Sequence, residues 1–83
     1  AEFEANFDNL HAHFFRNLRQ RYPSLTDNDL RFCAYLRLNL SSKDIASLMN
    51  ISLKGVEAAR ARIRKKISLP SSESLTAFMI DLK

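Results

Sequence analysis

Residues 41–67 read SSKDIASLMNISLKGVEAARARIRKKI, and this stretch decides the fold. Ser41 comes before an apolar run and has an Asp three residues later, a helix-start pattern of the capping-box kind. Asn50 tolerates the left-handed conformation that ends a helix, and Ser52 is a good N-cap for a second, basic helix. A helix, a sharp turn and a second helix form a helix-turn-helix, in which the small Ala46 lets the two helices approach closely.

The segment before this stretch predicts a helix at the centre of the core. Thr26 and Asp29 form another capping box, and Asn39 supplies a residue that can end the helix. Apolar side chains recur with helical spacing between them and spread around the helix. The main stripe consists of Phe32, Cys33, Leu36 and Leu40. We therefore expect Cys33 to be a small core residue.

Two amphipathic segments flank these helices. An N-terminal helix is predicted over 1–23, where Pro23 stops it, with a stripe made of Phe3, Phe7, Leu10, Phe14 and Leu18. A short helix is predicted over 71–83, with Leu75, Phe78, Met79 and Leu82 on one face. The chain has one Gly, one Val and two Thr, so strand formers are scarce. We predict an all-α fold of about five helices, forming one domain over 1–83 with a helix-turn-helix core at 25–67.

Positive charge is concentrated in the basic helix. Residues 52–67 hold six cations and one anion, Glu57, for a net charge of +5. The cations are Lys54, Arg60, Arg62, Arg64, Lys65 and Lys66. The whole chain has 13 cations and 9 anions, so the other residues hold seven cations and eight anions, a net charge of −1. Such a cluster is expected of a nucleic-acid or membrane-surface binder, and a solvated helix face is the plainer alternative.

Several function classes find little support in these residues. No nucleophile–base pair, phosphate loop or paired carboxylates can be assembled, so we expect no enzyme activity. His11 and His13 point about 200° apart on a helix, and no metal or cofactor is expected. No apolar run reaches the roughly 20 residues that span a bilayer, and the basic helix lacks large aromatics, so no membrane contact is expected. A single cysteine fits a reducing compartment such as the cytoplasm.

A set of residues with fixed spacing runs through the region 25–67. Its members are Leu25-Thr26, Asp29, Asn39-Leu40-Ser41, Lys43-Asp44-Ile45-Ala46, Met49, Ile51-Ser52, Val56, Ile63 and Lys66-Ile67. This pattern resembles the LuxR-type (GerE-like) helix-turn-helix, in a subgroup at the C-terminus of large Bacteroidetes regulators. The resemblance implies a bacterial, cytoplasmic transcription regulator that binds double-stranded DNA, with upstream sensor or repeat domains in the same polypeptide. Gly55 and Glu57 depart from the wider family, which has Thr and often Lys there.

A helical wheel of the basic helix predicts its DNA-facing surface. With Val56, Ile63 and Ile67 facing inward, the outward positions are Lys54, Ala58, Ala61 and Lys65. Glu57 and Arg64 lie on one flank, and Arg62 and Lys66 on the other. A helix of this width fits the major groove. The resemblance implies base reading near Glu57, Ala58 and Ala61. Phosphate contacts are expected from Lys43, Arg62, Arg64, Lys65 and Lys66, and Ser52 and Lys54 complete the predicted DNA-binding set.

One such unit reads only a few base pairs, so a homodimer on two half-sites is expected to supply specificity. The last helix, with Leu75, Phe78, Met79 and Leu82, resembles the family's pairing helix. The N-terminal stripe is a second candidate, although packing within the chain is favoured for it. Two other functions stay open: a promoter-binding module similar to sigma-factor region 4, and a protein-interaction module in which the basic helix docks on an acidic partner.

Asp29 and Arg60 both fall on the inward side of their helices. A carboxylate and a guanidinium near an apolar interface are costly unless satisfied. We expect them to pair, or Asp29 to accept from backbone N–H groups at a helix start. In the alternative interpretation Asp29 only caps its own helix and Arg60 reaches a phosphate.

Overall fold

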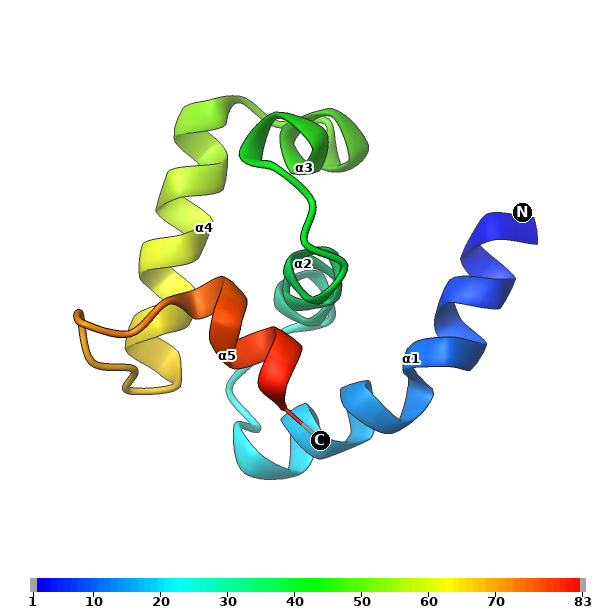
Figure 1. Ribbon diagram of the computed structural model, residues 1–83, viewed down its shortest axis with the longest axis horizontal. Helices are drawn as coiled ribbons and strands as arrows, with labels where there is room; N and C mark the ends of the chain where they lie inside the picture. Colours follow the sequence, from blue (N-terminus) through cyan, green and yellow to red (C-terminus); the bar gives the residue numbers. More distant parts are fainter. Residues whose placement is uncertain (1, 83) are drawn as a thin grey trace.

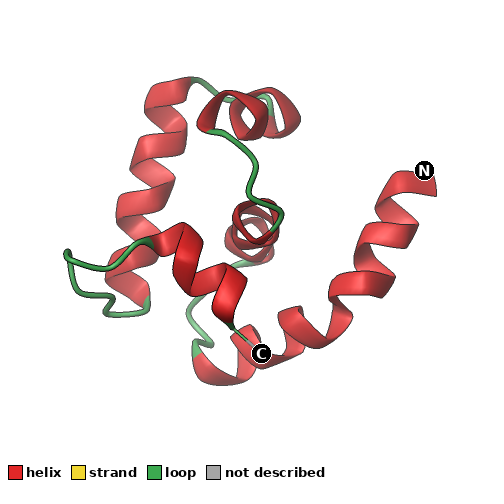
Figure 2. Cartoon of the chain, in the orientation of Figure 1, coloured by secondary structure: helices red, strands yellow, loops and turns green. Residues whose placement is uncertain are grey.

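The computed structural model describes the backbone of residues 2–82 and the side chains of residues 12–82. Over this range the chain forms five helices and no strand, which confirms the all-α prediction (Figure 1, Figure 2). The helices are α1 (Glu2–Arg21), α2 (Asp27–Arg37), α3 (Ser42–Met49), α4 (Leu53–Lys66) and α5 (Leu75–Asp81). The basic helix is therefore α4, and the helix-turn-helix consists of α3 and α4.

Hydroxyl N-caps begin each of the last four helices. The side-chain oxygens of Thr26, Ser41, Ser52 and Ser74 each accept from the backbone N–H three residues later. Asp29 and Asp44 accept in return from the N-cap backbone, so both predicted capping boxes are confirmed. The predicted start of the last helix at residue 71 is wrong. The Glu73 N–H donates to the Pro70 carbonyl at 3.0 Å in a turn, and α5 begins only after Ser74.

Left-handed residues end α2, α3 and α4 in the same way. Asn39, Asn50 and Ser68 have φ angles of 60°, 56° and 55°. In each case the next residue donates its N–H to a carbonyl five residues back, at 2.9–3.2 Å, so the last carbonyls are satisfied. Asn39 and Asn50 confirm the prediction. Ser68 was not foreseen, because serine is not a residue that favours this conformation.

The core forms around α2. All five residues from Phe32 to Leu36 are buried, and α5 packs directly against this helix. Cys33 is fully buried, and burial together with the nearby charge of Asp29 raises the pKa of its thiol to about 12. Its burial confirms the prediction of a small core residue, and the raised pKa keeps the thiol protonated at neutral pH.

Only the C-terminal half of α1 is described with its side chains. Phe14 and Leu18 are buried against the core, and Figure 1 shows the N-terminal half of the helix running away from the other helices. The predicted stripe members Phe3, Phe7 and Leu10, and also His11, lie outside the described side chains. Within the described residues, no helix combines the length and the apolar character needed to cross a bilayer.

Candidate nucleic-acid interface

The two faces of α4 are clearly separated. Val56 and Ile63 are fully buried, and Ile67 is buried just beyond the helix end, as predicted. Ala59 is buried as well, so this side of α4 lies flat against the core. The opposite face is exposed and consists of Lys54, Glu57, Ala58, Ala61 and Lys65. Cations at both ends thus enclose a centre of small side chains and one carboxylate.

The turn between α3 and α4 is held by backbone and cap bonds. Asn50 adopts the left-handed conformation, and the Ile51 N–H donates to the Ala46 carbonyl at 2.9 Å. The Ser52 hydroxyl then accepts from the Gly55 N–H at 3.0 Å. Ser52 was predicted to contact DNA, but its hydroxyl serves here to start α4. These bonds fix the direction in which α4 leaves the turn.

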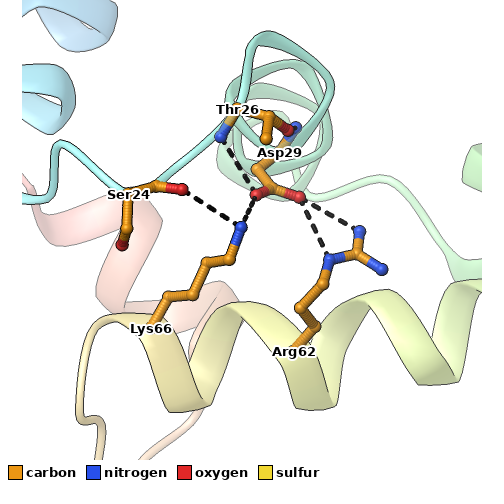
Figure 3. A network of polar contacts seen from close by, with 5 residues as sticks. All are labelled: Ser24, Thr26, Asp29, Arg62 and Lys66. Atoms are coloured by element: carbon orange, nitrogen blue, oxygen red, sulfur yellow. Dashed lines mark hydrogen bonds and ion pairs between the residues drawn. The ribbon is translucent and has the colours of Figure 1, made fainter.

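Asp29 joins α2 to α4 through a buried carboxylate (Figure 3). Its side chain is only 1% exposed. One oxygen accepts from Arg62 Nη2 at 3.0 Å and from Arg62 Nε at 3.3 Å. The other accepts from Lys66 Nζ at 2.7 Å and from the Thr26 N–H at 3.1 Å. Lys66 also donates to the Ser24 carbonyl at 3.1 Å, so its two hydrogen bonds hold α4 both to α2 and to the loop before α2.

The protonation of Asp29 reflects this environment. Burial alone would raise the pKa of the carboxyl, but the hydrogen bonds from Lys66, the Thr26 backbone and Arg62 favour the charged form more strongly. The net effect lowers the pKa of Asp29 from 3.8 to about 2. The carboxylate is therefore charged at neutral pH and neutralises part of the basic helix.

The predicted pair between Asp29 and Arg60 is wrong. Arg60 instead makes a long contact of 3.4 Å from Nη2 to the Ser42 hydroxyl on α3. The reason is the position of each residue around the axis of α4. Positions 62 and 66 share the flank of α4 that faces α2, whereas position 60 lies toward α3. Asp29 does accept from the Thr26 N–H at its own helix start, so the part of the prediction that concerns backbone donors is confirmed.

The cations predicted to contact DNA fall into two groups. Lys43, Lys54 and Lys65 are exposed, and none of them makes a hydrogen bond or ion pair to another described residue. The others have partners within the chain. Arg62 and Lys66 pair with Asp29, and their side chains are 48% and 25% exposed. Arg64 donates to the Pro70 carbonyl at 2.7 Å.

The face of α5 that was expected to support a dimer is largely internal. Leu75, Met79 and Leu82 are buried in the chain's own core, and Phe78 is partly buried. Burial within the chain leaves little of these three side chains open to a second copy, and pairing through this face stays a prediction.

Arg37 at the end of α2 explains how α5 is held, and the sequence did not single it out. Its Nη1 donates to the carbonyls of Met79 at 2.8 Å and Leu82 at 2.6 Å. The guanidinium also lies 4.9 Å from the ring centroid of Phe14 on α1. One side chain thus connects α1, α2 and α5. The only signal in the sequence was a cation in the last turn of a helix, which many helices carry.

Comparisons with protein-family models, with curated proteins and with solved structures found no match to the chain. The likeness to LuxR-type domains therefore stays a resemblance of residue pattern. Function has to be inferred from the charge and exposure of α4 and from the elements that hold it.

Proposed function

We propose that this chain binds duplex DNA with α4 in the major groove, as the DNA-binding unit of a LuxR-type transcription regulator. The observation that carries the proposal is the exposed face of α4. Lys54 and Lys65 stand at its ends, and Ala58 and Ala61 lie between them. Small side chains let a helix seat deeply in the groove, while the cations reach phosphates on either side.

The roles within the interface follow from the contacts. Lys43, Lys54 and Lys65 bind phosphates, and half-exposed Arg62 adds a fourth contact from its outer edge. Lys66 mainly fixes α4 against α2, because two of its contacts lie within the chain. Glu57 accepts a hydrogen bond from a cytosine amino group, the partner that a carboxylate prefers at base edges.

A salt titration tests the proposal. Four phosphate contacts predict that log K falls with log salt at a slope of about −3 to −4. A labelled pool of random duplexes is titrated at several salt concentrations, with an acidic polypeptide of equal charge as a competitor. Absence of duplex binding at low salt would remove the proposal. Equal binding to the acidic polypeptide would instead support a protein partner.

Two substitutions on the exposed face distinguish residues that contact phosphates from residues that recognise bases. Lys65→Ala is expected to weaken binding to all duplexes alike and to reduce the salt slope by about one. Glu57→Ala is expected to relax the preference at one base pair, by about 1–3 kcal/mol of discrimination. Selection from the random pool before and after each change measures both. An unchanged selected sequence for Glu57→Ala would contradict the reading role.

A further inference from the structure

Three large apolar side chains are exposed where α3 meets α4. Leu48 is 51% exposed, Ile51 is 39% exposed and Leu53 is 48% exposed. Ile51 leans against the first turn of α4, since a Cβ built on Gly55 would lie 3.4 Å from the Ile51 Cβ. Leu53 is the first residue of α4, directly before the exposed Lys54. Leu53 thus places an aliphatic side chain, half open to water, at the start of the basic helix.

Leu53 lies close to the side of α4 that is proposed to face the major groove. Cα–Cβ bonds in a helix tilt toward the N-terminus, so a side chain at the first position projects past the helix end. Leu53 precedes Glu57 by four residues, and the two therefore lie about 40° apart around the axis and about 6 Å apart along it. In helix-turn-helix proteins the N-terminal residues of the second helix meet base edges.

We propose that Leu53 contacts the C5-methyl group of a thymine, and this rests on the proposed function. In the major groove the thymine methyl is the apolar group among donors and acceptors, so it is the partner that an aliphatic side chain can recognise. Base pairs are spaced by about 3.4 Å along the duplex. The thymine thus lies about two base steps from the pair that Glu57 reads.

A thermodynamic cycle between protein and DNA tests this contact. Each thymine of the selected duplex is replaced in turn by deoxyuridine, which lacks only the methyl group. For the unmodified protein, one replacement is expected to weaken binding about fourfold, the effect of one buried methyl group. For Leu53→Ala the same replacement should have no effect. Leu48→Ala, which removes an equally exposed leucine from α3, should keep the full fourfold difference.

The outcomes separate this inference from the function on which it rests. If binding depends on salt, but replacing thymine by deoxyuridine weakens it equally for the unmodified protein and for Leu53→Ala, then only the role of Leu53 is overturned. Insensitivity to every replaced thymine would do the same. A change in the sedimentation of the free protein caused by Leu53→Ala would mean that a second copy covers this residue. Absence of duplex binding would remove the proposed function, and the contact with it.

Discussion

The carboxylate of Asp29 illustrates what a single buried charge requires. Leaving a carboxylate without partners in the core would be strongly destabilising. Asp29 accepts from Arg62, Lys66 and the Thr26 backbone, and the cap bond alone would leave one of its oxygens without a donor. The capping function and the link to α4 are thus performed by the same side chain.

Acid titration should reveal the energetic role of Asp29. Its pKa lies at about 2 in the folded chain against an ordinary 3.8, so its stabilisation is complete above pH 3.8 and disappears as the pH falls through 2. The shift corresponds to about 2 kcal/mol. Urea unfolding of the natural chain and of Asp29→Asn between pH 2 and 6 measures it. The natural chain should lose about 2 kcal/mol more than the variant, and parallel pH profiles would contradict the prediction.

At the scale of elements, the short helix α5 depends on Arg37. The carbonyls at the end of a helix have no partners within it, and here the carbonyls of Met79 and Leu82 accept hydrogen bonds from the Arg37 guanidinium. Replacing Arg37 by Met keeps most of the aliphatic stem but removes the donors and the charge.

We expect Arg37→Met to destabilise the chain by about 1–3 kcal/mol, the range for lost hydrogen bonds to a charged group. Amide hydrogen exchange should accelerate first in α5, because both of the lost hydrogen bonds lead to carbonyls at its C-terminal end. Arg16→Met, which alters an exposed cation on α1, is the matched control. Uniform acceleration across all helices would show that Arg37 is not specific to α5.

Local signals predicted the elements well, and spatial relations between elements less so. Thr26, Ser41 and Asn50 act through bonds between residues within five positions of each other, so the local sequence is enough to predict their roles. The partner of Asp29 depended on the rotation of α4 relative to α2, which no local pattern fixes. Burial of Asp29 together with the spacing of Arg62 and Lys66, one turn apart on one flank, was the signal that could have identified it.

At the scale of the whole molecule, the positive charge of α4 is expected to favour duplex binding and to lower the stability of the free chain. Residues 52–67 carry a net charge of +5, and Asp29 from α2 offsets part of it. The remaining repulsion between exposed cations is screened by salt, whereas the buried bonds of Asp29 are screened much less. Salt also screens the exposed pair of Arg19 and Asp27, but such surface pairs contribute little.

The free protein should therefore become more stable as salt is added, while duplex affinity falls. We expect the free energy of unfolding to rise by about 0.5 kcal/mol between 0.05 and 0.5 M salt. Lys65→Gln, which removes one exposed cation, should show a smaller rise. Chemical denaturation at each salt concentration provides the measurement. A fall in stability with salt would indicate that attractive pairs outweigh repulsion on this surface.

The complete burial of Cys33 makes the rate of thiol labelling a measure of core opening. The thiolate is the form that attacks thiol reagents, and at neutral pH Cys33 is both buried and protonated, with a pKa of about 12. Labelling therefore requires an opening of the helix that contacts α1, α4 and α5. Cys33 is the single cysteine of the chain, so the rate at which a maleimide adds to its thiol reports how often the core opens, without any engineered probe.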